Sequence, residues 1–151
     1  MSVPSDVRLG DVFSGMELAE VVFGPLERAD IVRYAGAAGD FNPIHIDDDY
    51  AQRAGAPTAF AMGMLPAGYL AHAVGDWFGG PQHLRRFRVR FLTRVWPGDE
   101  IVCWGRVDGV EGHLVKVRFE VDRRGPGPRE LELPAREPCL SGDADVEPVR
   151  A

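Results

Sequence analysis

Hydrophobic and polar positions follow two different periods along the chain, and each period predicts one kind of element. Apolar residues recur at helical spacing over Glu27–Ala38, and a longer apolar stretch predicts the main helix over Met64–Phe78. Further along, Arg86–Phe91 alternates charged and apolar residues with a period of two, which is typical of a strand. Two more strands are predicted over Ile101–Val107 and Leu114–Val121.

Weaker segments complete the predicted order of elements. Met16–Phe23 is predicted as a first strand that stops at a Gly-Pro pair, and Arg129–Leu133 is the candidate for the last strand. The prolines that follow predict an irregular segment or an edge strand, and the small and acidic residues at the end predict a disordered tail. We therefore expect one α+β domain over residues 1–140, an antiparallel sheet wrapped around a long helix, and a disordered tail over residues 141–151.

Composition excludes several classes of protein. The chain has 151 residues, of which 45% are hydrophobic and 26% charged, as in an ordinary globular protein. A formal net charge of -6 argues against a nucleic-acid or membrane partner, and no apolar run approaches the ~20 residues that span a bilayer. The first ten residues lack the apolar region of a signal peptide, so a cytoplasmic location is expected. Cys103 and Cys139 match no metal spacing, and we expect reduced, buried thiols.

The segment Tyr34–Asp47 carries the densest chemistry. A glycine is expected to end the preceding helix, and Pro43 keeps Asn42 out of the helical region. Asp40 and His45 are therefore held near each other by ordered, non-helical backbone. An acid beside an imidazole suits general acid–base catalysis. The alternatives are a turn-forming aspartate and a packed or surface histidine.

The acidic run Asp47–Asp49 has two interpretations. A metal ion such as Ca²⁺ or Mg²⁺ would need further oxygen ligands, and none lies nearby in the sequence. Asp47 is instead predicted to cap a short helix that continues to Arg53. No metal site is predicted.

The segment Tyr34–Asp47 resembles the hydratase motif of the MaoC-like (R)-specific enoyl-CoA hydratases and related 3-hydroxyacyl-thioester dehydratases. Tyr-Ala, Gly-Asp, Asn-Pro-Ile-His and the following Asp fall in register, and the turn at Pro97-Gly98-Asp99 is also similar. The resemblance runs from about Leu9 to Val121 and implies a hot-dog fold. It implies reversible hydration of a trans-2-enoyl thioester, carried by coenzyme A or acyl carrier protein, to the (R)-3-hydroxyacyl thioester. It also implies that no cofactor is needed.

The resemblance assigns roles to the polar residues of the motif. Asp40 and His45 would form a catalytic dyad that touches one water molecule. Asn42 would orient that water or brace the loop, and an Asx turn before the proline is an equally good explanation of this residue.

The start of the main helix would form the other half of the site. The resemblance implies that backbone amides at Gly63 and Met64 face the thioester oxygen, and a helix start offers such free amides. Many relatives carry histidine where this chain has Met62, so we expect a softer and more apolar pocket wall.

Partners and rival functions follow from the remaining features. Arg86 and Arg88 belong to the one basic cluster, which is either a solvated strand face or a site for coenzyme A phosphates or an acidic carrier protein. The main helix needs covering, and the family pairs two sheets, so we expect a homodimer or a heterodimer with a related subunit. A hot-dog thioesterase and a non-catalytic partner subunit of a heterodimeric dehydratase are the alternatives.

Overall fold

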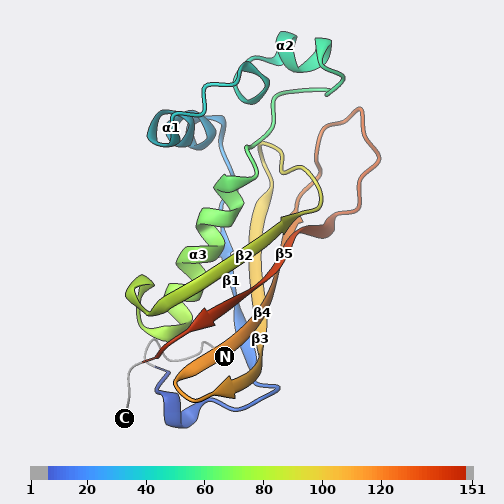
Figure 1. The fold of residues 1–151 in the computed structure, drawn as a ribbon. Helices are drawn as coiled ribbons and strands as arrows, with labels where there is room; N and C mark the ends of the chain where they lie inside the picture. The colour runs from blue at the N-terminus through green and yellow to red at the C-terminus, as the bar shows by residue number, and fades with distance from the viewer. Residues whose placement is uncertain (1–6, 149–151) are drawn as a thin grey trace.

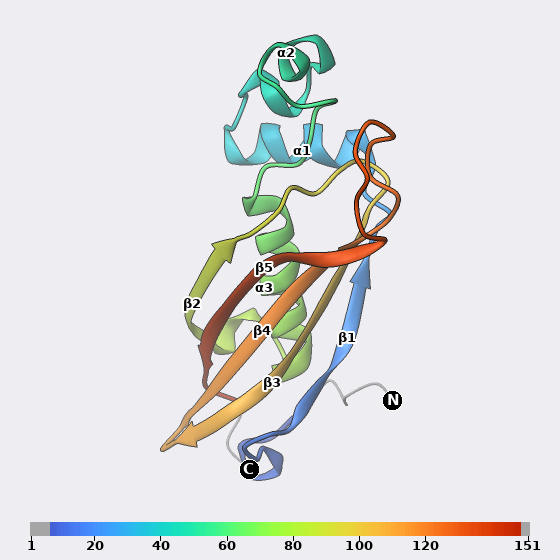
Figure 2. The same cartoon turned by 90° about the vertical axis from the view of Figure 1, so that its right-hand side faces the viewer.

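The structure is a computed structural model that describes residues 7–148. Its helices are α1 (Arg28–Ala38), α2 (Asp48–Arg53) and α3 (Met64–Phe78), and its strands are β1 (Glu17–Phe23), β2 (Leu84–Phe91), β3 (Glu100–Glu111), β4 (Leu114–Arg124) and β5 (Arg136–Val146). The strands form one antiparallel sheet in the order β1-β3-β4-β5-β2, and α3 lies along one of its faces (Figure 1). The outer strands flank α3, while α1 and α2 lie beyond the end of the sheet where α3 begins (Figure 2).

The main hydrophobic core lies between α3 and the sheet. The buried positions of α3 are Leu65, Pro66, Ala67, Leu70, Ala73, Val74, Gly75, Trp77 and Phe78. They meet alternate residues of β3 and β4, which point to the helix side because successive strand residues face opposite ways. The helix occupies the predicted range and ends at Gly79, whose φ of +83° is the left-handed conformation that stops a helix. Met64, Gly68 and His72 are exposed.

The C-terminal third differs from the sequence prediction. Residues 129–133 are a loop, and the last strand is β5, which pairs with β4 on one side and β2 on the other. It is therefore an interior strand, and it includes residues 141–146 of the predicted disordered tail. The predicted domain boundary at residue 140 falls inside β5. Residues 149–151 lie outside the described part of the chain.

β5 was not predicted because small residues weaken its alternation of apolar and polar positions. Leu140, Ala144 and Val146 point to the core, and the positions between them are polar or glycine, so the period of two is present but weak. Pro138 lies opposite Asp122, next to a register shift between β4 and β5. Its missing N–H therefore falls where the hydrogen-bond ladder is already irregular.

The connection between α1 and α2 is partly helical. It was expected to be non-helical, but Pro43–His45 forms one turn of 3-10 helix, which proline can start because its fixed φ suits that position. Asp47 caps α2 as predicted, and its side chain accepts a hydrogen bond from the Tyr50 amide.

A buried ion pair fixes the turn before β3. Asp99 and Arg123 are both fully buried, and Arg123 donates to the two carboxylate oxygens over 2.8 and 2.9 Å. Asp99 also accepts from the Trp96 amide, while Arg123 donates to carbonyl oxygens of Gly125 and Pro134. The pair thus ties the Pro-Gly-Asp turn to the loop between β4 and β5.

Both cysteines are buried and free, as the sequence predicts. Burial raises the pKa of the Cys139 thiol to about 12 and also raises the pKa of Cys103. Both groups are therefore neutral thiols at neutral pH. Within residues 7–148, no helix has the length and hydropathy needed to cross a membrane.

Candidate active site

Asp40 and His45 lie close together between α1 and α2. His45 Nε2 is 3.9 Å from Asp40 Oδ2, and the His45 side chain is 12% exposed while that of Asp40 is 43% exposed. The other ring nitrogen, Nδ1, lies 2.8 Å from the carbonyl oxygen of Phe60. A carbonyl can only accept, so Nδ1 carries the hydrogen, and in the neutral ring Nε2 presents its lone pair toward Asp40.

This arrangement leaves two hydrogen-bond acceptors facing each other. The carboxylate of Asp40 and the lone pair of His45 are too far apart for a direct hydrogen bond at 3.9 Å. A water molecule that donates one hydrogen to each would satisfy both groups. The geometry therefore suits a site where one water is oriented by an acid and an imidazole.

The local sequence explains why the two side chains meet. Gly39 ends α1 with a φ of +71°, which turns the chain at Asp40. Asn42 Oδ1 then accepts a hydrogen bond of 3.2 Å from the Ile44 amide, and the His45 amide bonds to the Asn42 carbonyl oxygen at 3.1 Å. Asn42 thus forms the Asx turn and braces the loop. Its side chain does not line the cavity described below.

Contacts of the Asp48 side chain fix the segment that lies next to His45. Asp48 Oδ1, at the start of α2, accepts from the Ala59 amide at 2.8 Å and from the Thr58 hydroxyl at 2.6 Å. Arg28 of α1 forms an ion pair with the same carboxylate at 2.9 Å. The hydrogen bonds from Ala59 and Thr58, followed by Arg28, lower the pKa of Asp48 to about 2. These contacts fix the chain immediately before Phe60, whose carbonyl orients the imidazole.

The dyad opens into a cavity of about 420 Å³. Its walls are the segment 60–63, the start of α3, residues 91–95 at and beyond the end of β2, and residues 139–140 of β5. Among the residues predicted from the sequence, it brings together Asp40, His45, Met62, Gly63 and Met64. Met62 is buried and is one of the residues that line the cavity, and its effect on the polarity of the wall stays a prediction.

The start of α3 offers backbone donors to this cavity. The Leu65 amide bonds to the Met62 carbonyl oxygen at 3.0 Å, and Pro66 has no N–H. Among residues 7–148, no protein acceptor is bonded to the Gly63 and Met64 amides. A methyl group added at Gly63 would lie 2.8 Å from the ring of Phe91, so a larger residue here would force that ring to shift.

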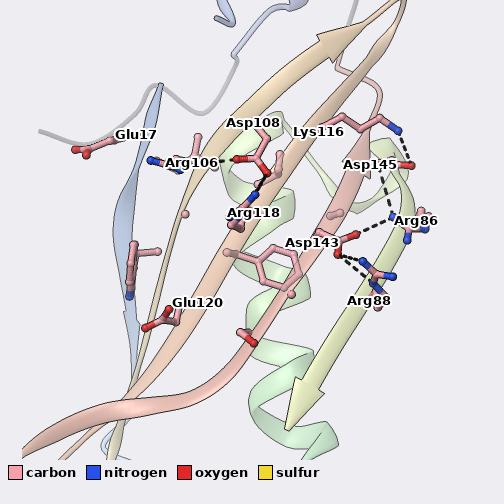
Figure 3. A pocket seen from close by; sticks show the side chains of 18 of the residues that line it. Glu17, Arg86, Arg88, Arg106, Asp108, Lys116, Arg118, Glu120, Asp143 and Asp145 are labelled. Atoms are coloured by element: carbon pink, nitrogen blue, oxygen red, sulfur yellow. Dashed lines mark hydrogen bonds and ion pairs between the residues drawn. The ribbon is translucent and has the colours of Figure 1, made fainter. Parts of the chain in front are cut away.

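Arg86 and Arg88 lie elsewhere. They project from β2 on the face of the sheet opposite α3, in an outer groove of about 990 Å³ (Figure 3). Asp143 of β5 pairs with both, at 2.7 Å from Arg86 and 2.6 Å from Arg88. The structure does not bring these arginines into the dyad cavity, and their role in phosphate binding stays a prediction.

The sequence did not single out Phe60, and it placed Arg94 in the basic cluster without separating it from Arg86 and Arg88. Phe60 contacts the His45 ring through its backbone carbonyl oxygen, and a motif of side chains cannot reveal a backbone contact. Arg94 belongs to the same basic run of sequence as Arg86 and Arg88, but it lies beyond the end of β2 and lines the dyad cavity. Within the described part of the chain, no three His, Cys, Asp or Glu side chains gather where they could hold a metal ion.

The fold and the cavity define a hot-dog protein with an acid–imidazole pair at the start of its central helix. The structure is similar to that of the R-hydratase PhaJ1 from Pseudomonas aeruginosa, with a TM-score of 0.79 and 21% identity, covering 99% of this chain and 88% of the other. That likeness confirms the predicted fold class.

The sequence identifies the family. Residues 14–123 match the MaoC like domain, so the chain belongs to the MaoC-like dehydratase family, as its motif predicts. A 3-hydroxybutyryl-CoA dehydratase of Methylorubrum extorquens is 33% identical over 130 residues, which are 85% of this chain and 73% of that protein. An (R)-specific enoyl-CoA hydratase of Rhodospirillum rubrum is 33% identical over 86 residues, or 56% of this chain. The match spans 60% of that relative's own length.

Proposed function

We propose that this protein catalyses the reversible hydration of a trans-2-enoyl thioester to the (R)-3-hydroxyacyl thioester. The observation that carries the proposal is the dyad, in which two acceptors face each other across 3.9 Å at the wall of a cavity. The names of the two relatives support the same chemistry. Asp40, His45, Gly63 and Met64 are the residues to which we assign the reaction.

The dyad would activate water in the hydration direction. Neutral His45 accepts one hydrogen of the water at Nε2, which points an oxygen lone pair at C3 of the substrate. Asp40 takes the other hydrogen as a proton while the oxygen bonds to C3. The electron pair of the C2–C3 double bond moves toward the thioester, and the proton on the dyad is then delivered to C2. The net change is addition of H and OH, and dehydration reverses each step.

The start of α3 would stabilise the charge that develops on the thioester oxygen. The amides of Gly63 and Met64 are available donors beside the same cavity, and a helix N-terminus favours negative charge. Asn42 keeps the loop in shape and takes no part in proton transfer. Met62 selects for an apolar acyl surface near the thioester.

The substrate would be a thioester of coenzyme A or of acyl carrier protein, with no metal or organic cofactor. We also propose that the working form is a homodimer or a heterodimer with a related hot-dog subunit. A shallow hollow between β1 and α3, lined by half-buried Phe23 and Tyr69 and exposed His72, would be covered in such an assembly.

Crotonyl-CoA tests the reaction class directly. Loss of the enoyl absorbance without release of free thiol is expected. Thiol release would instead identify a thioesterase, and no reaction would favour a non-catalytic subunit. Either result contradicts the proposal.

Variants of the dyad test the assigned residues. Asp40→Asn and His45→Gln should each lower kcat by at least ~10², the usual size of a general acid–base contribution. The double variant should be little worse, because both groups act on one water in one step. Asp49→Asn and His113→Gln make the same chemical changes at exposed positions outside the cavity and serve as controls. Folded dyad variants that keep most of the activity would refute the assignment.

A further inference from the structure

Arg94 is the one lysine or arginine among the described residues that line the dyad cavity. Its guanidinium carbon lies 4.6 Å from the centroid of the Phe60 ring, a cation–π contact. No carboxylate of residues 7–148 forms an ion pair with it, whereas Arg86 and Arg88 are both paired. The cavity therefore offers an exposed guanidinium that no carboxylate of the described residues neutralises.

The backbone on both sides of Arg94 is fixed. The Leu92 amide bonds to the Cys139 carbonyl oxygen at 2.9 Å, and the Thr93 hydroxyl donates to the Pro138 carbonyl oxygen at 3.0 Å. On the other side, the Val95 carbonyl oxygen accepts from the Ala61 amide at 3.0 Å. The Arg94 side chain itself is exposed, and its one recorded contact among the described residues is with the ring of Phe60, so the backbone places the guanidinium at the mouth of the cavity.

The position of Arg94 relative to the dyad limits what it can bind. The ring of Phe60 contacts both the guanidinium, at 4.6 Å, and the His45 imidazole, at 5.4 Å between centroids. The guanidinium carbon of Arg94 is therefore no further from the centre of the His45 ring than the sum of 4.6 and 5.4 Å. A phosphate of coenzyme A or of a carrier protein is about thirteen bonds from the thioester sulfur, which is about 15 Å for an extended chain. A carboxylate on a short acyl group would lie only a few bonds from C3.

We propose that Arg94 is a specificity residue that binds a carboxylate on the acyl chain of the thioester. This inference rests on the proposed function for the placement of C3, and it extends that function to thioesters of dicarboxylic acids. A guanidinium binds a carboxylate through two parallel hydrogen bonds, and an adjacent aromatic face does not compete for those donors. The preferred substrate would therefore be a short enoyl thioester with a terminal carboxylate.

Binding of saturated thioesters tests Arg94 without depending on catalysis. Butyryl-CoA and glutaryl-CoA differ by one terminal carboxylate, and neither can be hydrated. The unmodified protein should bind glutaryl-CoA more tightly by calorimetry. Arg94→Gln should raise the Kd of glutaryl-CoA roughly tenfold to a hundredfold, the usual effect of losing a hydrogen bond to a charged group, and leave butyryl-CoA nearly unchanged.

The matched control is Arg90→Gln, which removes the same charge from an exposed position outside the cavity and should change neither Kd. Equal weakening of both thioesters by Arg94→Gln would overturn the proposal. If that weakening disappears with N-acetylcysteamine thioesters, which lack phosphate, then Arg94 binds a phosphate of coenzyme A. If it persists, Arg94 only supports Phe60. Hydration of crotonyl-CoA tests the proposed function separately, so the two ideas can fail independently.

Discussion

Replacing Arg123 with methionine should remove a large share of the stability of this fold. The guanidinium is fully buried and makes two hydrogen bonds to Asp99, one to Glu137 and two to backbone carbonyls. Methionine preserves much of the aliphatic volume but leaves the Asp99 carboxylate in the interior without a cation.

The magnitude follows from the burial of both partners. Removing one partner of a buried ion pair typically costs ~3–5 kcal/mol, because the remaining charge has lost its compensation. For a domain of this length, each kcal/mol lowers Tm by about 2–4 °C, so a fall of roughly 6–20 °C is expected. Adding Asp99→Asn to Arg123→Met should recover part of the loss, because no carboxylate is then buried at position 99.

Thermal and urea unfolding of three variants would measure the effect. Arg124→Met is the matched control. Arg124 is the next residue along the chain, and it pairs with Glu100 at side-chain exposures of 40% and 36%. An exposed pair of this kind contributes about 0–1 kcal/mol. If Arg123→Met costs no more than Arg124→Met, the buried pair does not stabilise the turn and the reasoning is wrong.

Three further predictions follow from the site. Gly63→Ala should lower kcat because its methyl group collides with Phe91, whereas Gly36→Ala, with open space around it, should be active and somewhat more stable. The pKa of Asp48 is lowered from 3.8 to about 2, so its contribution to the free energy of unfolding is present above pH 3.8 and is lost as the pH falls toward 2. Acid titration of unfolding should show that loss, and Asp48→Asn should reduce it. Light scattering should give a dimer at micromolar protein, and a monomer mass would contradict the proposed assembly.

Elements bounded by local signals could be predicted from the sequence. α3 has the predicted limits because a glycine stands at each end of an apolar run, and α1 begins one residue after its predicted start. β5 could not be found in this way. Its two neighbours, β2 and β4, come from separate parts of the chain, so the pairing that makes it an interior strand leaves no local pattern. A Gly-Pro-rich loop and a weak alternation then resemble a frayed end.

The same distinction applies to the site. The proximity of Asp40 and His45 could be predicted because a short, rigid segment holds both of them. The basic run was harder to interpret, because Arg86 and Arg88 point to the outer face of the sheet while Arg94, past the end of β2, reaches the cavity. A count of charges along the sequence does not show where a strand ends, and that point decides which arginine lines the cavity.

The buried ion pair of Asp99 and Arg123 is connected to the dyad through a series of contacts. Asp99 fixes the Trp96 amide, and the Trp96 ring packs against Phe60 at 5.6 Å between centroids. Phe60 in turn orients His45 through its carbonyl oxygen. A continuous series of contacts therefore joins the Pro-Gly-Asp turn to an imidazole some fifty residues earlier in the sequence. It follows that the Arg123→Met protein, measured at a temperature where it is still folded, should lose kcat more than affinity, because the water and the imidazole would be misaligned while the cavity itself remains.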